Sequence, residues 1–394
     1  MDVLTKIREE QLENTISGPV QTPEEALSDS PTSLEEGMVF ETTGSTGSPK
    51  QIPCRNVDHV IGSMVEAFSL AGIEDDVVLN LGAPLPHISA WGFRQAIGRL
   101  GGRSANQHFR DYRAVVEDGS AAEVTTLIAA PSIARAIGGR IAEEYGPPAE
   151  VFPNLDRILG GADLMTAARR EVLRDLWGVE TIRETYATTE FNALAVTVDE
   201  TREKIPLLHR FVLEIVPDED PTEIVDIREV TEETRGSILI TAPDREAVDF
   251  TRYRIGDKVA VEPADEIPRI TILGREDDSI NLSGAFLYPA QIHEAVRETF
   301  GSGADWVARV SEREYPAVDF YIVDGEPHDA DRFRARLFEQ NAPVEQAYHD
   351  VDIIEYLDVH HVDTREEVPG LSSEGGMKQR NVVFDDSYSG DVAE

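Results

Sequence analysis

Apolar and polar residues follow two rhythms along the chain. Short apolar runs typical of buried strands, DVVLNLGA, VTTLIAA, LDRILGG and ETYAT, alternate with longer helical runs such as SIARAIGGRIAEEY and TAARREVLRDLW. This alternation predicts an α/β fold. From residue 211, the runs FVLEIVP, EIVDIREV and GSILITAP alternate apolar and polar positions, which predicts a β-rich subdomain. Residues 1–273 are therefore expected to form one large α/β domain with a β-rich subdomain.

The rest of the chain predicts a smaller α+β lid domain over residues 279–394. PAQIHEAVRETF and DADRFRARLFEQ have helical spacing, whereas VDFYIVDG and VDIIEYLDV are typical of strands. The segment GREDD, residues 274–278, lies between the two domains and is the expected hinge. The final FDDSYSGDVAE, residues 384–394, predicts a frayed acidic tail.

Composition narrows the class of protein. The chain of 394 residues carries 75 acidic and 36 basic residues, a net charge of −39. A protein this negative is repelled by phosphate backbones, so nucleic acid is excluded as a partner. Only five of the basic residues are lysines, and the acidic residues are spread along the sequence. We interpret this as a halophilic surface, in which high net charge maintains solvation; the alternative is an ordinary acidic mesophilic protein.

Location is also constrained by the sequence. Cys54 is the only cysteine, so the chain has no internal disulfide and no cysteine-rich metal site. The charged N-terminus lacks the apolar core of a signal peptide, and no apolar run of 18 residues occurs. We expect a cytoplasmic protein without a membrane span.

The segment TTGSTGSPK, residues 42–50, carries the first candidate chemistry. Gly44 and Gly47 permit positive φ angles, so that backbone N–H groups can converge on an anion, and Lys50 adds a positive charge. A solvated turn would have the same composition for purely local reasons. The pattern is not a Walker motif, because position 49 is proline. The segment therefore suggests phosphate binding outside the P-loop NTPases.

TTGSTGSPK resembles the signature of the adenylate-forming superfamily of acyl- and aryl-CoA synthetases, nonribosomal adenylation domains and luciferases. Further segments follow in the order of that family. ETYATTE (184–190) resembles Y-G-x-T-E, RYRIGDKV (252–259) resembles Y-R-T-G-D, and LGREDDSINLSGAFLYPAQIHEAV (273–296) resembles G-R-x-D-D-x-I with its following G, P and I. SSEGGMKQR (372–380) resembles the lysine motif G-K-x-x-R. The residues of the later motifs, including Pro289, look most like those of the phenylacetate-CoA ligase branch.

The resemblance implies roles for individual residues. Glu190 would bind Mg²⁺, which prefers oxygen ligands shared with substrate phosphates, and Thr189 would contact the α-phosphate. Asp257 would hold the ribose hydroxyls, and Arg275 offers a planar fork nearby. The small residues of ILGGADL, 158–164, resemble the adenine pocket. The implied nucleotide-binding set is Thr42, Thr43, Gly44, Ser45, Thr46, Gly47, Lys50, Gly161, Ala162, Tyr186, Asp257 and Arg275.

Other positions are less distinctive. His87 in LPHISAWGF resembles the histidine of the family's acyl pocket, with Trp91 and Phe93 as possible walls. A histidine that begins a helix beside core aromatics would look the same. Lys378 would neutralise the reacting carboxylate and α-phosphate, and Asp277 would be the hinge about which the lid domain rotates.

Three departures from the family pattern stand out. Only 41 residues precede the loop, so that part of the acyl pocket or of a dimer surface is expected to be missing or rebuilt. Arg380 follows Lys378 by two positions instead of the family's three. Ala187 replaces a glycine.

The resemblance implies an ATP- and Mg²⁺-dependent carboxylic acid–CoA ligase that forms an acyl-adenylate and releases pyrophosphate. Two alternatives remain open. The acceptor could instead be a carrier protein, an amine or a deazaflavin-type cofactor. A non-catalytic adenylate-binding relic would fit the short N-terminus and irregular lysine motif, but it is opposed by the intact loop, Glu190, Asp257 and Arg275. The expected partners are small molecules, with a homodimer possible.

Overall fold

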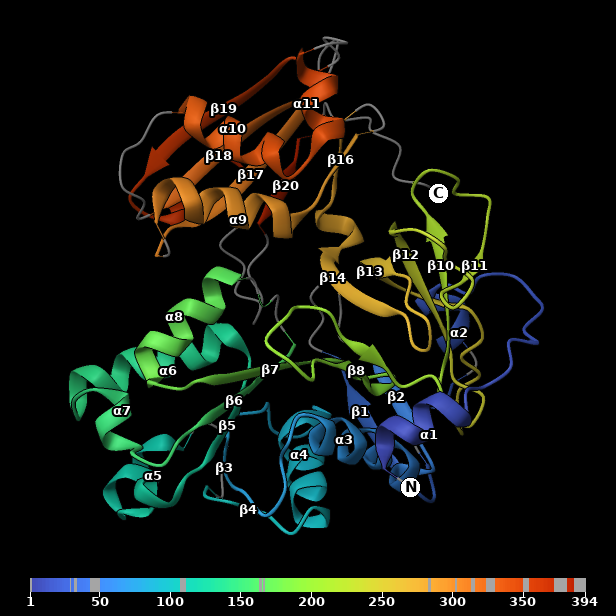
Figure 1. The fold of residues 1–394 in the computed structure, drawn as a ribbon, viewed down its shortest axis with the longest axis vertical. Helices are drawn as coiled ribbons and strands as arrows, with labels where there is room; N and C mark the ends of the chain where they lie inside the picture. The colour runs from blue at the N-terminus through green and yellow to red at the C-terminus, as the bar shows by residue number, and fades with distance from the viewer. Residues whose placement is uncertain are drawn as a thin grey trace. The chain divides into compact units, whose positions relative to one another are not determined.

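The computed structural model divides the chain into two compact units (Figure 1). The first comprises Met1–Met165 with Arg169–Ile272, and the second comprises Thr166–Ala168 with Leu273–Glu394. The structure describes residues 2–28, 30–31, 34–42, 50–106, 111–162, 165, 167–282, 285–301, 303–312, 316–323, 330–349, 354–371 and 381–385. Among the helices in these ranges, none combines the length and the apolar character that crossing a membrane requires.

A seven-stranded sheet forms the centre of the first unit over the residues described. Its first five strands are parallel to one another, and β8 and β9 add to one edge in antiparallel orientation. The parallel part corresponds to the predicted α/β alternation, because parallel neighbours need a crossover connection. In sheet order, the strands are β4 (Arg103–Ser104), β3 (Val77–Asn80), β5 (Thr126–Ala129), β6 (Arg157–Gly160), β7 (Thr181–Thr188), β8 (Asn192–Val196) and β9 (Ile205–Pro206).

Helices cover both faces of this sheet, as Figure 1 shows. Leu127 and Ile158 point into one core and their neighbours Ile128 and Leu159 into the other, because successive strand residues face opposite sides. Both faces are therefore buried, which explains why these strands are apolar runs. One core contains residues of α3 (Val57–Leu70) and α4 (Ile88–Arg99); the other contains residues of α5 (Tyr112–Glu117), α6 (Pro131–Glu144) and α8 (Ala167–Trp177).

The predicted β-rich subdomain is a five-stranded sheet in the order β11–β10–β12–β13–β14. The expected strand at EIVDIREV is confined to two residues, since Asp226 accepts the N–H groups of Arg228 and Glu229 and turns the chain. The strands are β10 (Val212–Pro217), β11 (Val225–Asp226), β12 (Thr234–Thr241), β13 (Tyr253–Glu262) and β14 (Arg269–Arg275). The unit also contains the hairpin β1 (Met38–Glu41) and β2 (Gln51–Cys54) and the helices α1 (Val3–Glu9), α2 (Pro23–Leu27) and α7 (Pro148–Val151).

The second unit has the expected α+β composition. Its four-stranded sheet has the order β19–β18–β17–β20, and its core includes Trp306, Phe320 and Phe333. The helix α9 (Pro289–Phe300) begins at the proline and stops before Gly301, whose φ of 96° suits glycine. The other elements are β15 (Ile280–Leu282), β16 (Ala285–Leu287), β17 (Asp305–Glu312), β18 (Pro316–Val323), α10 (Ala330–Glu339), α11 (Ala342–His349), β19 (Tyr356–Val362) and β20 (Val382–Phe384).

Two local predictions near the C-terminus differ from the structure in their bounds. The strand expected in VDIIEYLDV begins later, at Tyr356, where it pairs in parallel with β18. Phe384 belongs to β20 and not to a frayed tail, because β20 pairs with β17 and Arg309 forms an ion pair with Asp385. The remainder of the expected tail, residues 386–394, lies outside the described residues.

Candidate functional site

The ends of the Gly/Ser/Thr loop are joined by backbone pairing. Thr42 ends the strand-like segment and Lys50 precedes β2, so residues 43–49 connect the two strands of the β1–β2 hairpin. The Thr42 N–H donates to the Lys50 carbonyl at 2.9 Å, and the Lys50 N–H donates to Thr42 Oγ1 at 2.9 Å. The Thr42 hydroxyl is therefore part of the base of the loop. The predicted phosphate ligands Thr43, Gly44, Ser45, Thr46 and Gly47 lie outside the described residues.

His87 connects α4 to this hairpin. It precedes the first residue of α4, and its Nδ1 lies 2.8 Å from the Glu41 carbonyl oxygen. The Glu41 N–H donates to the Pro86 carbonyl at 3.0 Å. These contacts place the start of α4 beside the base of the loop, so both the helix-start and the pocket interpretations of His87 remain compatible with its position.

The two aromatic residues of α4 contact the core. The Trp91 ring lies 5.9 Å from Phe40 of β1, and the Phe93 ring lies 5.5 Å from Phe68 of α3. Both side chains are half-buried and pack against the same hydrophobic cluster. Their role as walls of an acyl pocket stays a prediction.

Tyr186 and Asp257 meet across two sheets. Tyr186 lies on β7 and Asp257 on β13, and the Tyr186 hydroxyl donates to Asp257 Oδ2 at 2.7 Å. Asp257 is only 9% exposed, so this phenol offsets part of the cost of burying the carboxylate. The structure thus brings together two residues that the sequence assigned to nucleotide binding.

Glu190 receives a similar hydrogen bond. It lies in the turn between β7 and β8 and is 6% exposed, and its Oε1 accepts from the Tyr253 hydroxyl at 3.1 Å. The turn is held by a hydrogen bond from the Phe191 N–H to Thr188 Oγ1 and by Asn192, whose φ is 61°. Thr189 lies in the same turn and is half-buried. A nearly buried carboxylate on a tight turn is well positioned for a specific ligand.

The end of β6 approaches β7 closely at Gly161. A Cβ atom on this glycine would lie 2.7 Å from Thr185 Oγ1, which is closer than real contacts allow. Ala162 follows with φ 63°, an unusual value for alanine. The backbone therefore leaves β6 by a constrained turn, and the adenine contact of this segment stays a prediction.

The remaining predicted residues lie in the second unit. Arg275 ends β14 and Asp277 lies in the 3₁₀ turn Glu276–Asp278. Lys378 and Arg380 fall outside the described residues, so the irregular lysine motif stays a prediction. The role of Asp277 as a hinge stays one as well.

A family model for AMP-binding enzymes matches residues 9–244, more than half of the chain. The chain belongs to the AMP-binding enzyme family. This match covers the hairpin loop, the Gly161 turn and Glu190, and it confirms the resemblance to the adenylate-forming superfamily. No curated protein matches the chain by sequence. The phenylacetate-CoA ligase branch stays a prediction.

Solved structures share the fold of this AMP-binding enzyme. A 2-hydroxyisobutyryl-CoA ligase in the postadenylation state with 2-HIB-AMP is 16% identical, with a TM-score of 0.68 over 94% of this chain and 80% of that one. ATP-bound MatB from Rhodopseudomonas palustris is 16% identical, with a TM-score of 0.61 over 83% of this chain and 64% of that one. The predicted adenylate-forming enzyme fold is therefore confirmed.

The site of this AMP-binding enzyme fits Mg²⁺ as a metal shared with a substrate. Within the part of the chain that the structure describes, no three His, Cys, Asp or Glu side chains are grouped to hold a metal by themselves. Glu190 Oε2 accepts no hydrogen bond from the described residues, so it offers a hard oxygen ligand. Mg²⁺ is commonly bound by one or two carboxylates together with substrate phosphates. The free oxygen of the Glu190 carboxylate therefore fits a Mg²⁺ ion that is shared with substrate phosphates.

Sequence reasoning missed Tyr253. Tyr253 begins the Y-R-T-G-D-like segment, whose pattern alone implies no role for it, but it is fully buried and contacts Glu190. A tyrosine in a β-strand is usually core, so spacing alone gave no signal. Its position four residues before Asp257 on one strand is the only hint in the sequence.

Proposed function

We propose that this chain is an ATP-dependent carboxylic acid–CoA ligase that acts through an acyl-adenylate. The observation that carries the proposal is the double pairing of Tyr253 with Glu190 and of Tyr186 with Asp257. These pairs hold two nearly buried carboxylates in the same unit, Glu190 on the turn between β7 and β8, suited to a metal, and Asp257 on β13, suited to vicinal hydroxyls. ATP presents both features, a metal-bound triphosphate and a ribose.

Each residue then has a chemical task. Asp257 accepts hydrogen bonds from the ribose hydroxyls, which fixes the α-phosphate relative to the carboxylate substrate. The hairpin loop and Lys50 bind the β- and γ-phosphates, which leave as pyrophosphate. Glu190 would hold Mg²⁺, which supplies charge neutralisation on the phosphate oxygens. Thr189 donates to the α-phosphate, and Lys378 neutralises charge between the carboxylate and the α-phosphate.

Coenzyme A is the proposed acceptor. A 2-hydroxyisobutyryl-CoA ligase with this fold is described in complex with 2-HIB-AMP and CoA, at 17% identity and a TM-score of 0.57. In our proposal the thiol attacks the acyl carbonyl, the new C–S bond replaces the acyl–phosphate bond, and AMP leaves. Rotation of the lid domain about Asp277 separates this step from adenylation.

Pyrophosphate exchange tests the proposal. A panel of aryl and acyl acids is screened in molar salt with Mg²⁺, and an accepted acid should support exchange of labelled pyrophosphate into ATP. Glu190→Gln should lower exchange by roughly 10²-fold or more, because it removes a positioned anionic ligand. Glu180→Gln, at an exposed carboxylate just before β7, is the matched control and should leave exchange unchanged.

Three results would contradict the proposal in whole or in part. Exchange at the wild-type rate in Glu190→Gln would remove Glu190 from the site. The absence of exchange with every acid, in a protein that still binds ATP, would favour the non-catalytic interpretation. Pyrophosphate exchange without thioester formation from CoA would support the adenylation step but exclude coenzyme A as the acceptor.

A further inference from the structure

A buried arginine in the first unit lacks partners for part of its side chain. Arg245 follows β12 and is 8% exposed. Its Nη1 lies 2.7 Å from Cys54 Sγ, whereas its buried Nε and Nη2 have no hydrogen-bond partner. A guanidinium stays protonated at all ordinary pH values. Arg245 therefore brings a permanent positive charge and two unused donor atoms into the interior.

No carboxylate of the described residues neutralises the charge of Arg245. Among the described residues, no carboxylate lies within ion-pair distance of Arg245, and the adjacent Asp244 and Glu246 are exposed. Cys54 does not supply the charge either, because burial raises the pKa of its thiol in spite of the nearby guanidinium. A buried charge without a counter-ion is strongly destabilising. A counter-ion from solvent would remove that penalty.

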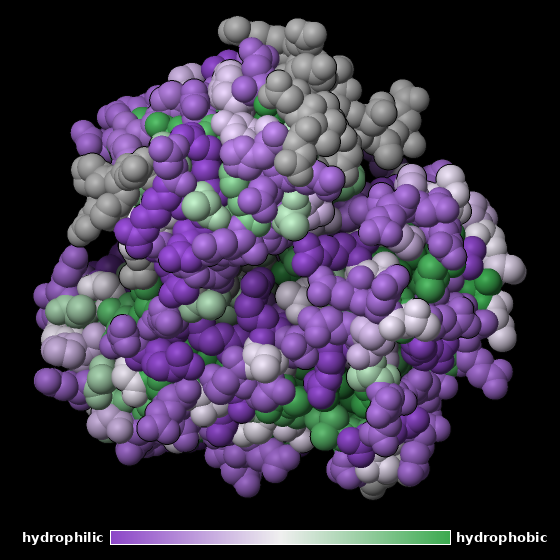
Figure 2. All heavy atoms as spheres, turned by 45° about the horizontal axis from the view of Figure 1, so that its top comes forward, coloured by the Kyte–Doolittle hydropathy of each residue, from purple (hydrophilic) through white to green (hydrophobic). Residues whose placement is uncertain are grey.

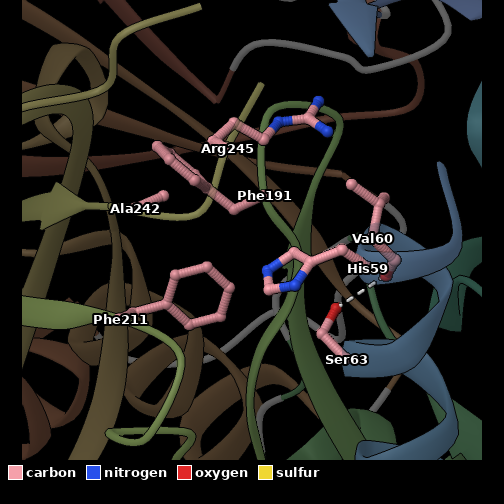
Figure 3. A pocket seen from close by; sticks show the side chains of 7 residues that line it. All are labelled: His59, Val60, Ser63, Phe191, Phe211, Ala242 and Arg245. Carbon is pink, nitrogen blue, oxygen red and sulfur yellow. Dashed lines mark hydrogen bonds between the residues drawn. The ribbon is translucent and has the colours of Figure 1, made fainter. Parts of the chain in front are cut away.

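A small cavity adjoins the guanidinium. Figure 3 shows the side chains around it, which come from α3, from the turn before β8 and from the β-rich subdomain. The cavity has a volume of about 10 Å³, enough for one particle of the size of water. It is lined by His59, Val60, Ser63, Phe191, Phe211, Ala242 and Arg245.

The lining is suited to an anion. Burial and the nearby Arg210 lower the pKa of His59, so its imidazole is neutral near pH 7 and can donate one N–H. The Ser63 hydroxyl donates to the Val60 carbonyl at 3.0 Å, so its proton is not available to a ligand in the cavity. A positive charge with unused donors and a neutral imidazole thus line one small space.

We propose that this cavity binds a single monovalent anion of the halide class, chloride in ordinary salt. The volume is too small for a carboxylic acid or a phosphate, so the site is separate from the substrate and nucleotide sites. A water molecule would fit, but it would leave the Arg245 charge uncompensated. A halide supplies the negative charge that a water molecule lacks.

Anion exchange at constant sodium concentration tests this site in the full chain. The thermal midpoint is measured in molar sodium gluconate that is replaced stepwise by chloride or bromide. The site predicts a saturable upward shift of roughly 2–5 °C for either halide. Arg245→Met removes the charge at similar length and should abolish the halide-specific shift. Arg235→Met, at an exposed arginine of β12, is the matched control and should retain it.

Direct binding keeps the test decisive should Arg245→Met fail to fold. The ³⁵Cl resonance should broaden on addition of the wild-type protein, and bromide should reverse the broadening. Identical midpoints in gluconate and in halide, together with no broadening that bromide displaces, would overturn the proposal. So would a halide-specific shift of the same size in Arg245→Met. Neither readout depends on ligase activity, so the result stands whether or not the proposed function is correct.

Discussion

At the residue scale, each of the two carboxylates proposed to bind ATP receives a phenol hydrogen bond. Tyr253 donates to Glu190 Oε1 and leaves Oε2 free of described partners, while Tyr186 donates to Asp257 Oδ2. Both tyrosines are buried, so their positions are fixed by packing. A ligand that is oriented by a buried partner binds a metal better than a mobile one.

Replacement of Tyr253 by Phe tests this orienting role. The ring packing among Phe191, Phe250 and Tyr253 is kept, while the hydrogen bond to Glu190 is lost. We expect the Mg²⁺ concentration for half-maximal pyrophosphate exchange to rise by about 10-fold, the effect of losing a group that orients a metal ligand. Tyr186→Phe is the control, since it should change the KM for ATP and leave the Mg²⁺ requirement unaltered. An unchanged Mg²⁺ requirement in Tyr253→Phe would assign that tyrosine to packing alone.

At the scale of elements, Glu66 of α3 joins three segments. Lys6 of α1 forms an ion pair with its Oε1 at 3.1 Å, Arg210 forms an ion pair with its Oε2, and His209 Nε2 lies 2.9 Å from the same Oε2. Burial would raise the pKa of Glu66, but the hydrogen bonds from His209 and Arg210 outweigh it and hold the pKa well below its usual range. The cluster therefore connects α1 and α3 to the segment after β9 only while Glu66 is ionised.

The pH dependence of this cluster has a defined sign. Because the folded pKa of Glu66 is depressed, its stabilisation is present above the unfolded pKa of about 4.3 and is lost as the pH falls below that value. Glu66→Gln should lower the free energy of unfolding by about 3–5 kcal/mol at pH 7, and the deficit should narrow by about 1.4 kcal/mol per pH unit below about pH 4. Denaturant unfolding of both proteins at pH 7, 4 and 3 in molar salt measures this deficit. Glu143→Gln, on the exposed side of α6, should show no such trend; a constant deficit for Glu66→Gln would contradict the assignment.

At the scale of the whole molecule, the net charge of −39 dominates. The face in Figure 2 is mainly hydrophilic, with hydrophobic residues in small separate areas. The negative charges on such a surface repel one another over a screening length that falls from about 10 Å at 0.1 M salt to about 3 Å at 1 M. The halophilic interpretation of the composition follows from this repulsion and remains a proposal.

Salt titration tests the halophilic interpretation. We expect the thermal midpoint to rise steeply from low to molar salt, because screening relieves the repulsion in the folded state. The rise should occur in sodium gluconate as well as in sodium chloride, which separates general screening from the halide site at Arg245. A midpoint that is unchanged between low and molar gluconate would remove the halophilic interpretation.

The lysines of this chain differ in their structural surroundings. Lysine is scarce in this chain, yet Lys204 and Lys258 are buried in ion pairs with Glu184 and Asp218. Burial lowers the pKa of Lys204, although Glu184 Oε2 lies only 2.9 Å away. Together with Lys6, which pairs with Glu66, three of the five lysines therefore have an evident structural role. Lys50 differs from them, because it forms no ion pair with the described residues and closes the hairpin loop.

The sequence by itself determined the family, the α/β alternation, the β-rich subdomain and the composition of the lid domain. These features are written in contiguous motifs and in local periodicity, which depend on neighbours a few residues away. Only the tertiary structure decided that Tyr253 contacts Glu190, 63 positions earlier, and that Arg245 contacts Cys54, 191 positions earlier. Such contacts depend on the register and packing of separate sheets and helices, so neither the uncompensated Arg245 nor the cavity beside it can be inferred from spacing along the chain.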